Sequence, residues 1–195
     1  MIRPIAPDDK ELVRAGFARL SPDSRYRRFL TPMTHLSEQQ LAYLTEVDHH
    51  DHEALVAIDR NTTEGLGVAR FVRDQVDPDT AEAAVTVIDD RQGQGLGTVL
   101  LDALVKRARE EDVRRFTFLV LAENRGMIEL LEPIAPAREI DRQPGTVELA
   151  IDLPPADEGI GAPLAQLLRA AASGVAEFVA RRTAAAAPDA PEERR

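Results

Sequence analysis

One stretch of the chain combines residue types that bind anions. Residues 85–98 read Val-Thr-Val-Ile-Asp-Asp-Arg-Gln-Gly-Gln-Gly-Leu-Gly-Thr. The pattern predicts a strand, a tight glycine turn and the start of a helix. Amides in the first turn of a helix lack intrahelical acceptors, and the helix dipole adds partial positive charge there. The stretch therefore predicts a site for a phosphate or pyrophosphate, which approaches the backbone closely only where no Cβ is in the way.

Two common nucleotide-binding patterns fit this stretch poorly. A Walker A loop ends in Gly-Lys-Ser/Thr, whereas Gly97 is followed by Thr98 and Val99. The dinucleotide fingerprint is G-x-G-x-x-G, whereas these glycines are spaced G-x-G-x-G and come late in the domain. A glycine-rich turn that binds nothing is the purely structural alternative.

The residues before the glycine turn predict an edge strand, helices and a meander. Residues 2–6 include Pro4, which cannot donate to a central ladder. Helices are expected from Asp8 or Asp9 to about Leu20 and from Ser37 onward, with a further turn at residues 24–29. Strands separated by short polar turns are expected at 53–59, 65–72 and 81–88, which indicates an antiparallel meander.

After the glycine turn the periodicity of the sequence predicts alternating helices and strands. A helix to about Asp112 is expected to bury Leu96, Leu100, Leu104 and Ala108, with Val99 and Ala103 beside them. Residues 115–121 are almost wholly apolar, which is typical of a strand buried on both faces. A helix from Asn124 to about Leu131 and a hairpin of residues 136–140 and 146–152 follow. The fold class is mixed α/β (α+β), with a mostly antiparallel central sheet flanked by helices.

Gln92-x-x-Gly95-x-Gly97 resembles the Q/R-x-x-G-x-G/A signature of the GCN5-related N-acetyltransferase (GNAT) superfamily. The order of elements expected over residues 1–152 is also that of the GNAT fold. The resemblance implies acetyl-CoA as co-substrate, its pantetheine arm pairing with the strand of Val85 and Val87 and contacting Asn124. It also implies that a run of amides holds the pyrophosphate, those of Gln92, Gly93, Gln94, Gly95, Gly97 and Thr98.

A narrower resemblance is to bacterial protein-lysine acetyltransferases that modify acyl-CoA synthetases. It is carried by Ser24-Arg25-Tyr26-Arg27-Arg28-Phe29, Leu36-Ser37, Val47-Asp48 and His52-Glu53-Ala54-Leu55-Val56-Ala57. This resemblance makes Glu82 the general base, and we expect its strand to bury it partly; an exposed strand-end glutamate without a role is the alternative. A backbone N–H near Val87 would hold the developing oxyanion. Many family members carry a tyrosine where this chain has Leu131, so the general acid is unassigned.

Two polar clusters admit both functional and structural interpretations. Arg25, Arg27 and Arg28 either line the acceptor cleft or bind phosphate, or they form a solvated helix face with one structural ion pair. Residues 49–52 (His-His-Asp-His) contain metal-binding residue types. Neighbours in sequence point in different directions, so we expect a turn that leads into a strand, and no metal.

Composition excludes several classes of function. The net charge of -10 argues against binding nucleic acid through phosphate contacts. The absence of cysteine excludes a thiolate metal site and a cysteine nucleophile, which favours direct transfer. No apolar run is long enough to span a membrane, and the charged N-terminus does not resemble a secretory signal. We expect a cytoplasmic protein.

The sequence divides into a catalytic domain and a C-terminal extension. Residues 1–153 form the expected GNAT domain, 154–184 a helical extension and 185–195 a disordered tail. The helix expected over 156–184 would dock on its own domain, form a homodimer contact or bind a partner. The expected acceptor is an amine, with protein lysine first and a small amine second. A non-catalytic acyl-CoA-binding sensor is the alternative from another class.

Overall fold

The apolar and alternating segments of the chain come together in one seven-stranded sheet. The computed structural model describes residues 1–154, and the helix and tail expected beyond residue 154 lie outside the described residues. The strands, in chain order, are β1 (Ile2–Pro4), β2 (His52–Ile58), β3 (Gly65–Arg73), β4 (Thr80–Val87), β5 (Arg115–Leu121), β6 (Arg138–Gln143) and β7 (Thr146–Asp152). Their order in the sheet is β1-β2-β3-β4-β5-β7-β6.

The pairing confirms a mostly antiparallel sheet. All neighbouring strands run antiparallel except β4 and β5, which are parallel. The expected meander is β2-β3-β4, and the expected edge strand is β1, with Pro4 at the margin of the sheet. The closing hairpin turns at Gly145, whose φ of 88° lies in the region that glycine adopts without strain. The first strand of this hairpin runs over Arg138–Gln143, later than residues 136–140.

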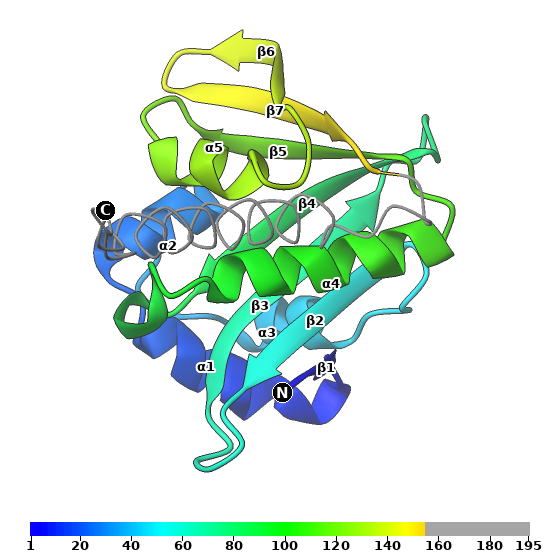
Figure 1. Ribbon diagram of the computed structural model, residues 1–195. Coiled ribbons are helices and arrows are strands. Elements are labelled where there is room, and N and C mark those ends of the chain that lie inside the picture. The colour runs from blue at the N-terminus through cyan, green and yellow to red at the C-terminus, as the bar shows by residue number, and fades with distance from the viewer. Residues whose placement is uncertain (155–195) are drawn as a thin grey trace, which may run out of the picture. The chain divides into compact units, whose positions relative to one another are not determined.

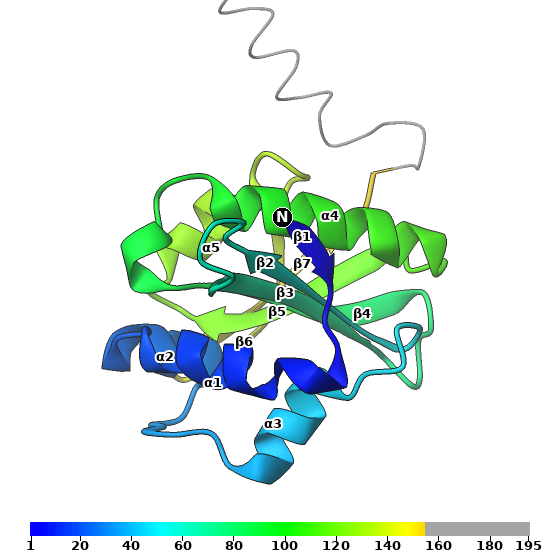
Figure 2. The ribbon, with the colours of Figure 1, turned by 90° about the horizontal axis from the view of Figure 1, so that it is seen from below.

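Helices cover both faces of the sheet, as Figures 1 and 2 show. On one face lie α1 (Lys10–Ala18), α2 (Pro22–Phe29) and α3 (Glu38–Thr45), and on the other α4 (Leu96–Glu110) and α5 (Arg125–Leu131). Short 3₁₀ turns precede α1 at Pro7–Asp9 and the glycine turn at Asp89–Arg91. Within residues 1–154 no helix is both long and apolar enough to cross a membrane.

Local sequence explains where the first helices begin. The structure corrects two expectations about these helices. The turn expected at residues 24–29 is the helix α2, because the hydroxyl of Ser21 accepts from the amide of Ser24 and Pro22 occupies the first turn. Asp9 does not cap α1 through its side chain. Its carboxylate instead forms an ion pair with Arg3, at 2.7 Å, and accepts from the amide of Ala6.

Each face of the sheet buries its own apolar cluster. Under α1 and α3 the chain buries Phe17, Leu20, Leu36 and Leu41. Beneath α4 the phenylalanines of β3 and β5 meet, with the rings of Phe71 and Phe116 5.9 Å apart. The buried side of α4 consists of Leu100, Leu101, Leu104, Val105 and Ala108. Val99 is 54% exposed, so the expectation that it lies beside the buried stripe is wrong.

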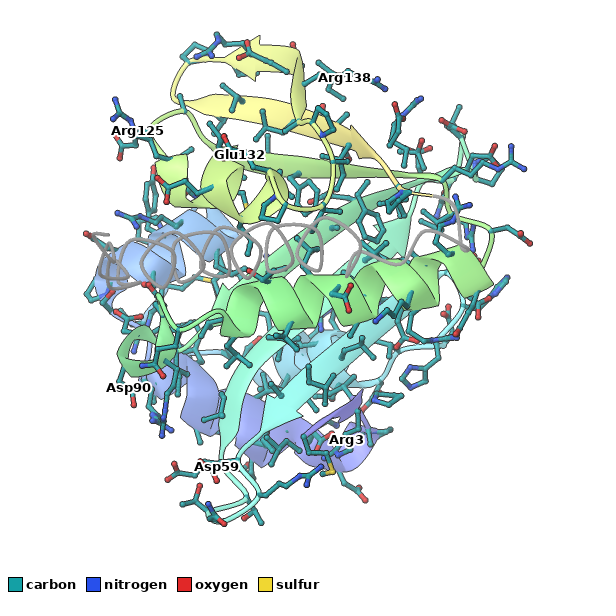
Figure 3. The ribbon with its side chains drawn as sticks, in the orientation of Figure 1. Arg3, Asp59, Asp90, Arg125, Glu132 and Arg138 are labelled. Carbon is teal, nitrogen blue, oxygen red and sulfur yellow. The ribbon has the colours of Figure 1, made fainter. Side chains whose placement is uncertain are left out.

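Charged side chains occupy the periphery. Figure 3 shows Asp90, Arg125 and Arg138 at the rim of the molecule, and these three residues and Glu132 are exposed. Their positions leave the interior of the sheet to apolar residues and to the few polar side chains described below.

Candidate active site

A gap opens in the middle of the sheet where β4 and β5 diverge. Their parallel pairing covers three residues of each strand and ends at Glu82 and Thr117. Both strands continue beyond this point, to Val87 and Leu121, and Figure 1 shows them separating. The expected burial on both faces holds for most of β5, but Leu119 lacks a neighbour on the β4 side and is 46% exposed.

The hydrogen-bond alternation of β4 directs part of its backbone into this gap. The amide of Ile88 donates to the carbonyl of Leu66 on the β3 side. In an antiparallel pair, bonded and non-bonded positions alternate. The N–H and C=O groups of Val85 and Val87 therefore point away from β3, toward the gap, where an extended ligand can pair with them as an added strand.

The glycine turn lies at the end of the gap and has the conformation that its residues predict. Gly93 and Gly95 have φ values of 69° and 79°, in the left-handed region. A Cβ at either position would meet nothing within 4 Å, so the space above the turn is open. Gly95 is the N-cap of α4, whose first amides therefore face that space together with the positive end of the helix dipole.

Gln92 fastens the turn to its surroundings. Its side-chain amide donates to the carbonyl of Val87 at 2.9 Å and lies 3.3 Å from the hydroxyl of Ser24 in α2. Burial raises the pKa of the neighbouring Asp89, but hydrogen bonds from Ser21 and Ser24 outweigh burial, so the pKa of Asp89 is lowered. The residue that opens the motif thus joins β4, the turn and α2.

The edge of β4, the glycine turn and Gln92 all line one cleft of about 700 Å³. Its walls include all of the residues expected from the sequence except Gln94: Glu82, Val85, Val87, Gln92, Gly93, Gly95, Gly97, Thr98 and Asn124. The side chain of Gln94 turns away and donates to the carbonyl of Asp90. The cleft has the size and the polar backbone groups of a cofactor site.

Glu82 stands where β4 and β5 part. Its side chain is exposed, so the expectation of partial burial is wrong. Residues alternate along a strand, so Glu82, Ala84 and Thr86 share the face that α1, α2 and α3 cover. Arg28 lines the same cleft; burial lowers the pKa of its guanidinium, and the charge of Glu82 opposes that effect.

Two of the three arginines of α2 line the cleft, and the third has a structural role. Arg27 and Arg28 line the cleft. Arg25 instead points back toward α1, where its guanidinium stacks 4.5 Å from the ring of Phe17 and donates to the carbonyls of Phe17, Ala18 and Thr34. It has a structural role.

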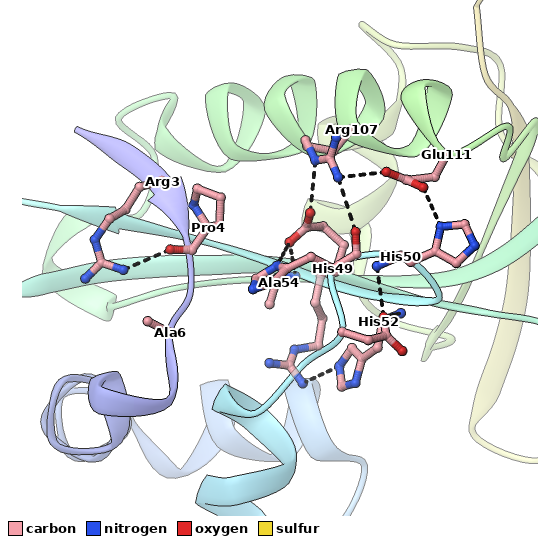
Figure 4. Close-up of polar contacts among 12 residues, drawn as sticks. Arg3, Pro4, Ala6, His49, His50, His52, Ala54, Arg107 and Glu111 are labelled. Carbon is pink, nitrogen blue, oxygen red and sulfur yellow. Dashed lines mark hydrogen bonds and ion pairs between the residues drawn. The ribbon is translucent and has the colours of Figure 1, made fainter.

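The histidine-rich segment is a turn stabilised by ionic contacts (Figure 4). One carboxylate oxygen of Asp48 accepts from the amides of residues 50, 51 and 52. The imidazoles then diverge, with His49 next to Glu53, His50 next to Glu111 and His52 next to Arg70. Across the part of the chain that the structure describes, no three His, Asp or Glu side chains are grouped to hold a metal.

Glu53 is fully buried beneath this turn and is paired. It accepts from Arg107 of α4 at 2.9 Å and from the amide of Ala54 at 2.8 Å. Burial lowers the pKa of Arg107, but its hydrogen bonds to Glu53, Glu110 and Glu111 outweigh burial, so the pKa of Arg107 is raised. The pair joins β2 to α4.

Sequence reasoning missed a buried arginine near the cleft. Arg70 of β3 is 5% exposed and donates to the carbonyl of Leu44 and to Nε2 of His52. Burial and the charge of Arg28 lower the pKa of Arg70 to about 10. Burial and the charge of Arg70 likewise lower the pKa of His52 to about 4. An arginine within the apolar strand Gly65–Arg73 was the available signal.

Leu131 is the residue for which the family resemblance leads one to expect a tyrosine. It is fully buried and does not line the cleft. No side chain at this position can deliver a proton to a leaving thiolate.

Comparison with known proteins identifies relatives of the chain. Residues 9–133 match the model of the Acetyltransferase (GNAT) family. Acetyltransferase Pat of Mycolicibacterium smegmatis is 35% identical over 156 residues, which cover 80% of this chain and 46% of Pat. The chain thus spans about half the length of that relative.

Two further relatives extend the comparison. Acetyltransferase PA5475 of Pseudomonas aeruginosa is 34% identical over 132 residues, 67% of this chain and 70% of that protein. The crystal structure of the GNAT domain of S. lividans PAT aligns with a TM-score of 0.72 at 31% identity, covering 78% of this chain and 89% of that one. That alignment confirms the GNAT fold.

Proposed function

The chain belongs to the Acetyltransferase (GNAT) family, and from this premise we propose that it transfers an acetyl group from acetyl-CoA directly to an amine, with Glu82 as general base. The acceptor we propose is a lysine of a cytoplasmic protein. The observation that carries the proposal is the gap between β4 and β5, where β4 has no partner strand beyond Glu82, with the glycine turn at its end and a carboxylate where it begins.

The residues of the cleft fit acetyl-CoA. The amides of the glycine turn and the first turn of α4 offer donors and partial positive charge to a pyrophosphate. The edge of β4 that has no partner strand offers the N–H and carbonyl of Val85 and the N–H of Val87 to the amides of a pantetheine arm, while the carbonyl of Val87 already accepts from Gln92. Asn124 faces the cleft from the start of α5, where its side chain caps no helical amide and is free for the same arm.

When bound, acetyl-CoA supplies a thioester with a good leaving group. Glu82 accepts a proton from the acceptor ammonium, and the resulting neutral amine bonds to the carbonyl carbon as the carbon–sulfur bond breaks. The N–H of Val87 points into the gap and donates to the carbonyl oxygen as negative charge develops on it. Overall, one ammonium group and acetyl-CoA give an amide, free CoA and one proton.

Two features support a lysine as the acceptor. The chain resembles bacterial protein-lysine acetyltransferases over the α2 segment and residues 47–57, and a relative over 80% of the chain is Acetyltransferase Pat. The net charge of -10 favours encounter with a cationic acceptor, while local backbone amides provide for the anionic co-substrate.

Release of free thiol from acetyl-CoA tests the proposal. The protein is incubated with acetyl-CoA and with lysine-containing proteins, peptides or small amines, and acetyl-CoA binding is measured separately by calorimetry. We expect binding, together with thiol release that depends on a lysine-containing acceptor. Release with small amines alone would favour a small-amine acetyltransferase. Tight binding without thiol release from any acceptor would favour a sensor.

A further inference from the structure

The face of the sheet that carries Glu82 also carries a buried positive charge. Arg70 of β3 pairs with Ala84, which lies two residues after Glu82 on β4. Paired residues of neighbouring strands project to the same face, so Arg70 is a diagonal neighbour of Glu82. Its buried guanidinium donates to the carbonyl of Leu44 and to Nε2 of His52. Neither of these acceptors is an anion that would balance its charge.

Arg28 of α2 adds a second positive charge beside the same carboxylate. It lines the cleft together with Glu82, and it lines the space under α1 together with Arg70. Its half-buried guanidinium lies over the ring of Phe29, 5.0 Å from the ring centre. Burial and the charge of Arg28 lower the pKa of Arg70, and burial lowers the pKa of Arg28 while the charge of Glu82 opposes that effect. The three charged groups are therefore electrostatic neighbours.

Arg28 lacks the carboxylate partner that several other arginines of the fold have. Three of those arginines form ion pairs of 2.7 to 2.9 Å: Arg3 with Asp9, Arg73 with Asp51 and Arg107 with Glu53. Among residues 1–154, no carboxylate lies within ion-pair distance of the Arg28 guanidinium. Removing a charged group from water is unfavourable unless an opposite charge compensates for it. A bound anion would supply that compensation in the cleft.

Two guanidiniums beside the proposed base affect which acceptors can reach it. A lone ammonium group that approaches Glu82 is attracted by one carboxylate and repelled by the charges of Arg28 and Arg70. An acceptor that carries a carboxylate next to its ammonium group offsets this repulsion, because that carboxylate can pair with Arg28. The planar fork of a guanidinium suits such a group, since it donates two parallel hydrogen bonds to the two carboxylate oxygens.

We propose that Arg28 selects acceptor lysines that have an aspartate or glutamate directly beside them in the sequence, and that it binds the carboxylate of this neighbour. The inference rests on the proposed function and specifies its acceptor. Arg70 stays engaged with Leu44 and His52 and contributes positive charge behind Arg28. The net charge of -10 favours basic acceptors at long range, so a preference for an acidic neighbour would identify a local contact.

A peptide series tests the proposal with the full chain. A peptide with one lysine carries alanine, glutamine, glutamate or arginine directly before or after that lysine, and a further peptide carries glutamate at its far end. Thiol release from acetyl-CoA gives kcat/KM, and calorimetry in the presence of free CoA gives the Kd of each peptide. We expect glutamate beside the lysine to raise kcat/KM and to lower Kd by about tenfold or more relative to glutamine. Glutamate at the far end should have no such effect.

Variants of the protein attribute the preference to Arg28. Arg28→Gln should bring the glutamate-to-glutamine ratio of kcat/KM to about one, because a neutral amide cannot replace the ion pair. Arg28→Lys should keep part of the ratio, since it retains the charge and loses the fork. Arg60→Gln removes one positive charge from an exposed residue outside the cleft and should leave the ratio unchanged. If thermal unfolding shows that Arg28→Gln does not fold, Arg28→Lys and the peptide series still decide.

Two results would overturn the inference and leave the proposed function intact. One is acetylation of glutamate-flanked lysine no faster than that of glutamine-flanked lysine, and the other is an unchanged preference in folded Arg28→Gln. If acetyl-CoA binds tightly and no lysine peptide is acetylated, the proposed function fails instead. The Kd values of the peptides would then still report whether Arg28 binds the acidic neighbour.

Discussion

At the scale of single residues, the contact between Arg70 and His52 determines the protonation state of the histidine. Arg70 and His52 share one hydrogen bond at 3.2 Å, in which the arginine donates to Nε2 of the imidazole. A protonated imidazole has no acceptor to offer there, so the contact requires neutral His52. This agrees with its pKa of about 4, which burial and the charge of Arg70 produce.

The pH dependence of stability follows from this lowered pKa. Between about pH 6.5 and pH 4 the unfolded chain binds a proton on His52 and the folded chain does not, so stability falls as pH falls through that window. His52→Gln keeps an acceptor for Arg70 and removes the titration. We expect urea denaturation to show a shallower loss of stability between pH 6.5 and pH 4 for this variant than for the unmodified protein.

A matched control separates His52 from histidines in general. His35 is exposed, and His35→Gln should keep the unmodified slope. Carboxylates with lowered pKa values that do not contact His52, such as Asp9 beside Arg3, lose their stabilising charge at more acidic pH and contribute equally in all three proteins. Parallel stability curves for His52→Gln and the unmodified protein would contradict the assignment.

At the scale of elements, the glycine turn is the part of the fold that the site depends on most. Its two left-handed glycines let β4 pass into α4 while the first helical amides face the cleft. The side chain of Gln92 holds the turn against Val87 and α2. The site needs both the left-handed conformation of Gly93 and Gly95 and the open space above them. A residue with a Cβ is strained in that conformation and occupies part of that space.

Gly95→Ala tests the role of the turn. Alanine in the left-handed region costs about 1–2 kcal/mol, so the free energy of unfolding should fall by about that amount. The added methyl group and the shifted amides should also weaken acetyl-CoA binding by at least tenfold. Thermal unfolding and calorimetry measure the two effects.

Gly145→Ala is the matched control for the turn. Gly145 has a φ of 88° and open space at its Cβ, but it lies in the β6–β7 hairpin and does not line the cleft. It should lose similar stability and keep full affinity for acetyl-CoA. Equal loss of affinity in both variants would show that the glycine turn has no specific role in binding.

At the scale of the whole molecule, the sequence predicted well the order of elements and the place of the glycine turn between β4 and α4. These depend on local signals: the polar turns of the meander, the spacing of Gly93, Gly95 and Gly97, and the apolar stripe of α4. The helix α2 could also have been predicted from the sequence, because Ser21 and Pro22 form a helix N-terminal signal.

The features that sequence could not provide depend on which segments become neighbours. The exposure of Leu119 follows from the divergence of β4 and β5, which no pattern within residues 115–121 encodes. The contact between Arg70 and His52 depends on the register of β2 and β3 and on the placement of α3. The apolar space that Leu12 and Phe17 of α1 line together with Phe29 of α2 likewise arises only when these helices cover the sheet.

The central claim is that Glu82 acts as the general base for transfer from acetyl-CoA held in the cleft. The most direct measurement is kcat for lysine acetylation and Kd for acetyl-CoA in Glu82→Gln, with Glu123→Gln, an exposed glutamate outside the cleft, as control. We predict at least a tenfold loss of kcat with unchanged Kd for Glu82→Gln, and no change for the control. Unchanged kcat in Glu82→Gln would contradict the account.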